Sequence, residues 1–370
     1  MIRWKRATPL ALAALLLAPL AAVAQEEPPA GEVREQVEVT EVLLDVLVTD
    51  ARGNVILGLD ESDFVVTEDG KPIELTDAVF YSNRRLLDAP VAAVQADVRR
   101  PEVAQGTEDR YFILFLDDQR SAALEAPSLL TQQMEAVRRA REWVATELVP
   151  GDHVAVVSYD KKLKVHQDFT ADRAALDAAL KAAGKGKDTD GNWPSRIEGQ
   201  VGTSLRAALP RGNELRDRTA NIYEALQVLA RAAGDVRGRK NLLYLGIGFG
   251  RINSFGQYTP DPRYYDDMVR ALNDNNVAFY ALDLTPAGTE HVLSDALNQI
   301  AGDTGGKYYF NTVNFLTPLR QVSEENSGYY LLSYKATHPA GAKGFQRVQV
   351  HTANPEFRLR AREGYVFGES

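Results

Sequence analysis

Hydrophobic residues occupy alternate positions early in the chain, a period of two that is typical of half-buried β-strands. The first such face is formed by Val42, Leu44, Val46 and Val48. A second run, residues 63–68, leads into Asp69-Gly70, a dipeptide that favours a tight hairpin turn. The pattern predicts a small antiparallel β unit over residues 36–83.

From Arg110 onward, continuous apolar runs alternate with helical periods. Strands are predicted at 111–116, 154–159, 241–245, 277–282 and 307–310, and helices at 124–148, 171–183, 222–233, 262–275 and 290–304. Continuous apolar strands are covered on both faces, as in parallel sheets. The fold class is therefore α/β, a Rossmann-like, doubly wound, mostly parallel sheet over 110–325. Residues 84–109 form a predicted linker, and 184–218, rich in glycine and charge, an irregular insertion.

The tail returns to the strand pattern over residues 326–370. Neither end of the chain has enough strands for a core of its own, so we expect the two sets to pack together into one β unit. The α/β part would then be inserted between its halves. Arg358, Arg360 and Arg362 alternate along the last predicted strand, and we interpret them as a solvated face.

The N-terminus, MIRWKRATPLALAALLLAPLAAVAQ, combines a basic start, a short apolar run and a small-residue site. This order predicts a signal peptide over 1–24, cleaved after Ala24, followed by a disordered leader at 25–35. A retained anchor is the alternative, but Pro19 interrupts the apolar run. The mature protein is expected to be secreted or periplasmic, without stable membrane insertion.

The composition of the chain limits the kinds of molecule that it can bind. The chain has no cysteine, which excludes disulfides and a lipid-modified cysteine. Its net charge of −9 argues against nucleic acid as a partner, because phosphate backbones need a basic surface. A protein ligand, a glycan or a cation remains.

The strand at 111–116 ends on Asp117 and Asp118, with Ser121 shortly after. Carboxyl ends of parallel strands meet at one edge of a sheet, so Asp160 and Asp283 should share that edge. With a strand order of 3-2-1-4-5-6, Asp160 lies one strand to one side of Asp117 and Asp283 two strands to the other. These carboxylates could bind a cation, or they could cap helices and loop amides.

Several segments resemble one known family. FILFLDDQRS, PGDHVAVVSYD, NIYEAL and LNQIAGDTGGKYYF, with a YYLLSY and REGY ending, resemble the von Willebrand factor A (VWA) fold and the bacterial VWFA-related proteins. The resemblance implies a metal-ion-dependent adhesion site built from a D-x-S-x-S motif, a threonine and an aspartate. It implies ligand binding by Asp117, Asp118, Gln119, Ser121 and Thr219, and a magnesium or manganese ion at Asp117 and Ser121. Asp160 is added as a third metal ligand because of its predicted place on the neighbouring strand.

The adhesion motif is degenerate in all three loops. Gln119 replaces a serine, Arg120 adds a positive charge, and Thr219 falls one residue early. Gly246-Ile247-Gly248 stands where the family has its aspartate. Fewer anionic ligands imply weaker cation binding.

No catalytic constellation is recognisable: there is no G-x-S-x-G, and the five histidines are scattered. The leading hypothesis is an exported, non-enzymatic VWA-domain binding protein with a degenerate adhesion site. The first alternative is a metal-free structural or assembly component of the bacterial envelope. The second is a hydrolase, which would need a histidine close to Asp117 or Ser121.

Overall fold

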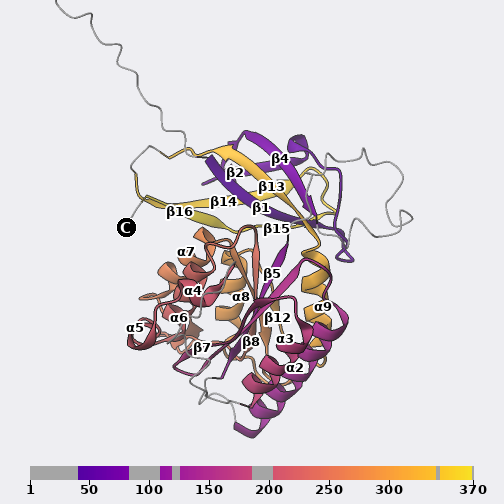
Figure 1. Ribbon diagram of the computed structural model, residues 1–370. Helices are drawn as coiled ribbons and strands as arrows, with labels where there is room; N and C mark the ends of the chain where they lie inside the picture. The colour runs from indigo at the N-terminus through magenta and orange to yellow at the C-terminus, as the bar shows by residue number, and fades with distance from the viewer. Residues whose placement is uncertain (1–40, 83–108, 119–125, 186–202, 339–341, 369–370) are drawn as a thin grey trace, which may run out of the picture. The chain divides into compact units, whose positions relative to one another are not determined.

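The computed structural model describes residues 41–82, 109–118, 126–185, 203–338 and 342–368 (Figure 1). All of them lie within the compact unit Val39–Ser370. The predicted signal peptide, the leader and nearly all of the predicted linker lie outside the described residues, as do Gln119, Arg120 and Ser121.

A six-stranded sheet forms the centre of the α/β part. Its strands are β5 (Arg110–Asp117), β6 (Asp152–Tyr159), β7 (Leu163–Thr170), β8 (Lys240–Gly246), β11 (Val277–Asp283) and β12 (Tyr308–Tyr309). They lie in the order β12-β11-β8-β5-β6-β7, which is the predicted doubly wound order. All neighbours are parallel except β6 and β7. The mostly parallel α/β sheet is confirmed.

Strand β7 was not predicted. Its sequence LKVHQDFT places the polar residues Lys164, His166 and Asp168 at alternate positions, so it lacks the continuous apolar run of the other strands. All three side chains are buried. The other face of the strand carries Leu163 and Val165. Both are buried in the core between the sheet and α6, and this burial stabilises the strand.

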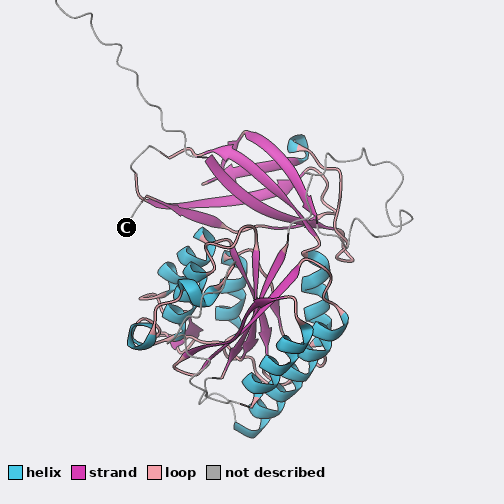
Figure 2. Ribbon diagram, viewed as in Figure 1, coloured by secondary structure: helices cyan, strands magenta, loops and turns pink. Residues whose placement is uncertain are grey.

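Helices cover both faces of this sheet (Figure 2). One face packs against α2 (Ala126–Thr146), α3 (Arg173–Gly184) and α9 (Leu316–Glu325). The other packs against α6 (Ile222–Ala232), α7 (Tyr265–Asp274) and α8 (Ser294–Asp303). Helix α9 was not predicted, and the predicted irregular insertion contains two short helices, α4 (Leu205–Ala208) and α5 (Gly212–Asp217). No helix in the described ranges is long and apolar enough to cross a bilayer.

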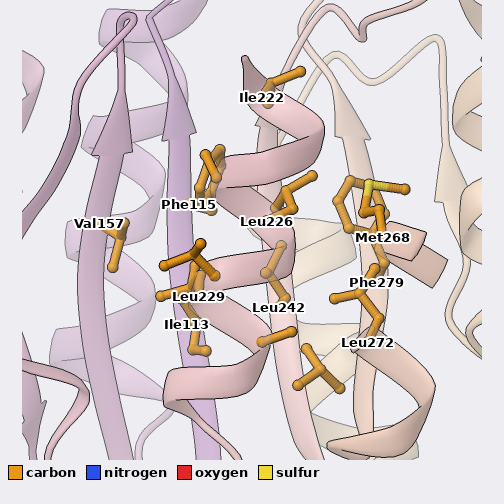
Figure 3. Close-up of a cluster of buried hydrophobic side chains, with 14 of the residues drawn as sticks. Ile113, Phe115, Val157, Ile222, Leu226, Leu229, Leu242, Met268, Leu272 and Phe279 are labelled. Carbon is orange, nitrogen blue, oxygen red and sulfur yellow. The ribbon is translucent and has the colours of Figure 1, made fainter. Parts of the chain in front are cut away.

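The core between the sheet and α6 and α7 explains the apolar runs (Figure 3). Phe115 of β5 and Phe279 of β11 point toward Leu226 of α6 and Met268 of α7. Every residue of β8 and β11 is buried, so neither strand shows a polar face in its sequence.

Strands from the two ends of the chain form two antiparallel sheets. One has the order β15-β1-β13-β4 and the other β16-β14-β2-β3. The bounds are β1 Glu41–Thr49, β2 Phe64–Glu68, β3 Lys71–Ile73, β4 Leu75–Ser82, β13 Gly328–Lys335, β14 Gly344–Thr352, β15 Arg358–Arg360 and β16 Gly364–Phe367. Because β1 pairs with β13 and β2 pairs with β14, the predicted packing of N-terminal with C-terminal strands is confirmed. Asp69 and Gly70 both have positive φ (46° and 78°), which matches the predicted tight turn.

Arginines connect the β strands with the α/β part. Arg360 pairs with Glu325 at the end of α9. Arg362 donates to the backbone oxygens of Leu43 in β1 (2.7 Å) and Asn273 in α7 (3.1 Å). The interpretation of this arginine stripe as a solvated face is wrong for Arg360 and Arg362. A period of two predicts that one face of a strand is polar, but it does not show whether solvent or another part of the protein covers that face.

Candidate functional site

The carboxyl ends of the parallel strands define the candidate site. β5 ends at Asp117 beside Tyr159 of β6, and β11 ends at Asp283 beside Gly246 of β8. The order of connection reverses between β5 and β8, and ligands of doubly wound folds bind at such a switch point. Asp160 follows β6, so the predicted positions of Asp160 and Asp283 on either side of Asp117 are confirmed.

Asp117 and Tyr244 meet at this switch point. The hydroxyl of Tyr244 donates to Asp117 Oδ2 at 2.5 Å and accepts from the backbone N–H of Gly248 at 3.1 Å. Both side chains are buried. Burial, followed by the charge of Asp117 and its hydrogen bond, raises the pKa of Tyr244 well above its usual value. The phenol therefore keeps its proton and remains a donor to the carboxylate.

The absence of a side chain at Gly246 makes this contact possible. A Cβ at that position would lie 2.5 Å from the Tyr244 hydroxyl oxygen and 2.8 Å from Asp117 Cβ. The resemblance to the VWA fold predicts an aspartate in this loop. In this chain Tyr244 occupies the space beside Asp117.

Asp118 is partly buried next to two other acids. Burial, followed by the charges of Asp117 and Asp160, raises its pKa to about 7, and the positive charge of Lys164 opposes the shift. Its backbone N–H donates to the Tyr159 carbonyl at 2.9 Å. At neutral pH this carboxyl group is therefore present in both protonation states.

Lys164 places a positive charge among these acids. Its Nζ lies 3.0 Å from Asp160 Oδ2, and its side chain is 3% exposed, against 41% for Asp160. Sequence reasoning missed this residue because β7 was not predicted. The available signal was a lysine between the apolar residues Leu163 and Val165.

Thr219 does not turn its hydroxyl toward the sheet edge. The side chain is buried, and its Oγ1 donates to the Leu215 carbonyl at 2.7 Å. The Thr219 carbonyl accepts from the Tyr159 hydroxyl at 3.0 Å. Next to it on α6, Glu224 has an enclosed Oε2 without a hydrogen-bond partner among the described residues. Glu224 was missed because an acid in the first turn of a helix is ordinary.

Asp283 belongs to a second polar cluster. Its Oδ2 lies 2.6 Å from His291 Nδ1 and accepts from the Tyr308 hydroxyl at 2.8 Å, while Oδ1 accepts from the Thr285 N–H at 2.8 Å. His291 Nε2 lies 3.0 Å from Asn311 Oδ1. Asp283 thus holds together the loops that follow β11 and β12. This agrees with the alternative in which the carboxylates bond to loop amides and do not bind a cation.

One serine and histidine pair occurs near this edge. Ser158 Oγ lies 2.8 Å from His166 Nε2, on adjacent strands. Both side chains are buried, so a substrate could not reach the serine oxygen. We interpret the pair as a hydrogen bond of the core.

The described residues do not fit a divalent cation. A hard cation needs about six oxygen ligands. Within the described ranges, no three His, Cys, Asp or Glu side chains gather in a way that could hold a metal ion. Asp117 accepts from a phenol and Asp160 pairs with a lysine. The predicted magnesium or manganese ion at Asp117, Ser121 and Asp160 stays a prediction, since Ser121 is not described.

No protein-family model matches the chain, and no curated protein matches it. Similar solved structures include the conserved hypothetical protein BatB from Bacteroides thetaiotaomicron (15% identity, 59% of this chain, 97% of that chain, TM-score 0.37). An aerotolerance-related membrane protein from Bacteroides fragilis NCTC 9343 is similar at 12% identity, over 59% of this chain and 98% of that one, with a TM-score of 0.37.

The ArnB paralog VWA2 from Sulfolobus acidocaldarius shares 10% identity over 90% of this chain and 76% of its own, with a TM-score of 0.32. Identities and scores of this size assign neither a family nor a function. The α/β fold rests on the strand order and the layers of this chain, and the resemblance to the VWA family stays a prediction.

Proposed function

We propose that this chain is a non-enzymatic binding protein, which binds a protein ligand at the switch point between β5 and β8. The position of the partly exposed Asp118 and Asp160 at this edge supports the proposal most directly, because doubly wound folds bind ligands at the carboxyl ends of their strands. Export to the envelope or the medium is part of the proposal and rests on the N-terminal sequence pattern.

Binding at this edge would not require a divalent cation. Tyr244 donates to Asp117, and Lys164 brings a positive charge to Asp160. Buried or partly buried carboxylates need such partners, and here the protein supplies them. A ligand would meet fixed donors and acceptors of the chain itself.

Selection from a library of short random peptides tests the binding function. Peptides are selected on the immobilised protein in chelator and then measured against an Asp118→Asn, Asp160→Asn double variant. We expect a loss of affinity of about tenfold or more, which corresponds to about 1.4 kcal/mol. The matched control is Asp217→Asn with Asp235→Asn, two exposed acids elsewhere. If no selected peptide distinguishes the edge variant from this control, the proposed site is wrong and a purely structural role is favoured.

Calorimetry tests the independence from metal. Chelator-treated protein is titrated with magnesium, manganese and calcium, next to an Asp117→Ala variant. The proposal expects no saturable binding that depends on Asp117. Saturable binding that the variant abolishes would instead establish the adhesion-type site predicted from the sequence.

A further inference from the structure

Four exposed apolar side chains stand on two loops at the carboxyl edge of the sheet. Ile252 (55% exposed) and Phe255 (86%) belong to the hairpin formed by β9 (Arg251–Ile252) and β10 (Tyr258–Thr259). Phe310 (57%) and Val313 (83%) belong to the loop between β12 and α9. Single exposed apolar residues are ordinary, whereas a cluster on adjoining loops is typical of an interaction site. We call these four residues the apolar edge surface.

The two loops adjoin through the turn that precedes α8. Leu293 packs against the start of the hairpin so closely that a Cβ at Gly248 would lie 2.9 Å from Leu293 Cβ. Two residues earlier in the same turn, the ring of His291 meets the edge of Phe310, with centroids 6.1 Å apart at 82°. The turn before α8 thus contacts both the segment that leads into the hairpin and the loop that carries Phe310.

Hydrogen bonds and stacking hold the surface in place. Asn253 Oδ1 accepts from the backbone N–H groups of Phe255 (2.9 Å) and Gln257 (3.0 Å), which fixes the tip of the hairpin. Phe310 stacks on Tyr308 at 5.5 Å and 18°, and the Tyr308 hydroxyl donates to buried Asp283 at 2.8 Å. A surface ordered before binding loses less conformational entropy on binding.

Two exposed acids lie beside the Phe310 loop of this surface. Glu290 and Asp295 are exposed, and among the described residues neither forms an ion pair. Glu290 precedes His291 in the turn, and Asp295 is close enough to raise the pKa of Tyr308, although less than burial and Asp283 do. On the hairpin side, Arg251 and Arg263 both face Asp261, at 3.8 and 2.6 Å. The uncompensated negative charge therefore lies beside the Phe310 loop, where a positive charge on a partner would complement it.

We propose that the apolar edge surface docks a segment of a partner protein in which aliphatic or aromatic residues stand next to lysine or arginine. The inference rests on the proposed function, because both treat the chain as a binding protein, and it adds the chemistry of the ligand. A second copy of this chain is the less suitable occupant, since each copy carries a net charge of −9.

The test uses the same random peptide library and adds a counter-selection on a variant that lacks two exposed apolar side chains. Peptides bound by the wild type are depleted on a Phe255→Ser, Val313→Ser variant, and the remaining sequences are determined. We expect these peptides to be enriched in apolar residues and in lysine or arginine. Affinity should fall about tenfold with Phe255→Ser, Val313→Ser and by a smaller factor with Glu290→Lys. The matched control is Leu43→Ser with Val65→Ser, an exposed apolar pair in the β strands.

The outcomes separate this inference from the proposed switch-point site. The inference would be overturned if the remaining peptides were acidic. It would also be overturned if the Leu43→Ser, Val65→Ser control lost as much peptide affinity as the Phe255→Ser, Val313→Ser variant. Peptides that depend on Phe255 and Val313 but not on Asp118 and Asp160 would support it while contradicting the switch-point site. Concentration-dependent dimerisation in sedimentation, lost in the Phe255→Ser, Val313→Ser variant, would replace the partner protein by a second copy and overturn the inference as stated.

Discussion

The hydroxyl of Tyr244 lies 2.5 Å from Asp117 Oδ2, which joins β8 to β5 at the point where the order of the strands reverses. In adhesion-type sites a carboxylate at the end of the first strand faces a cation. Here a neutral phenol, held in its protonated form by burial, faces it instead. At the strand end where the sequence predicts a metal site, Asp117 thus has a hydrogen-bond donor from the neighbouring strand.

Removal of this hydroxyl should destabilise the protein. In Tyr244→Phe, the buried Asp117 carboxylate loses a donor, and we expect a loss of about 1–3 kcal/mol in the free energy of unfolding. Urea unfolding measures the difference. The control is Tyr264→Phe, whose hydroxyl has no hydrogen bond to any described residue and which should change the stability by less than about 0.5 kcal/mol. Equal effects of the two substitutions would contradict the role of the contact.

A methyl group at Gly246 should separate the same pair. Gly246→Ala places a Cβ 2.5 Å from the Tyr244 hydroxyl oxygen, in a packed core that cannot yield freely. We expect a loss of about 1–3 kcal/mol, measured by thermal or urea unfolding. Gly302→Ala is the matched control, because it lies in α8 with space around it and should be neutral or stabilising by about 0.5–1 kcal/mol. A stabilising Gly246→Ala would show that the strand ends can rearrange.

Arg110 and Asp152 form a buried pair at the opposite, amino-terminal ends of β5 and β6. Arg110 Nε lies 2.7 Å from Asp152 Oδ1, and a second guanidinium nitrogen lies 2.8 Å from Oδ2. Arg110→Ala leaves a buried carboxylate without a counter-ion, and we expect a loss of about 3–5 kcal/mol. Arg138→Ala, which breaks an exposed pair with Glu135, should cost less than about 1 kcal/mol. If urea titrations showed similar losses of unfolding free energy for Arg110→Ala and Arg138→Ala, burial would not explain the importance of the Arg110–Asp152 pair.

Lys240 should make stability depend on pH in the alkaline range. Burial lowers its pKa to about 8 from 10.5, and the charge of Asp45 opposes this shift. The folded state thus releases the lysine proton at lower pH than the unfolded state, so stability rises as pH increases from about 8 to 10.5 and is lost as pH falls through about 8. The rise is at most about 3 kcal/mol.

Unfolding midpoints between pH 7 and pH 10.5 measure this contribution. The stability difference between wild type and Lys240→Met should grow in favour of the wild type over this range. Lys335→Met, at an exposed lysine of β13, is the control and should show a constant difference. A constant difference for Lys240→Met as well would contradict the lowered pKa.

Much of the fold was predictable because burial leaves a direct trace in the sequence. The parallel strands are buried on both faces and read as uninterrupted apolar runs, and the Asp69-Gly70 turn requires a backbone that few other residues adopt. Strand β7 was missed for the converse reason. Its buried polar side chains have partners that no local pattern shows. His166 lies 2.8 Å from Ser158 of β6, and Asp168 accepts from Ser204, 36 residues further along the chain.

The candidate site was located more accurately than it was characterised. Chain order and the doubly wound rule suffice to bring Asp117, Asp160 and Asp283 to one edge. They do not show that Tyr244 donates to Asp117, that Lys164 pairs with Asp160, or that Thr219 bonds within its own turn. Each of these contacts depends on where a side chain points.

The sequence by itself determined the α/β class and, with the doubly wound order assumed, the edge at which the acids gather, because periodicity and connectivity are local or topological properties. Only the tertiary structure decided what those acids contact and which apolar residues remain exposed. Hydrogen-bond partners and exposure depend on packing between segments far apart in the chain, such as β5 with β8 or the hairpin with the turn before α8. No pattern along the sequence records such distances.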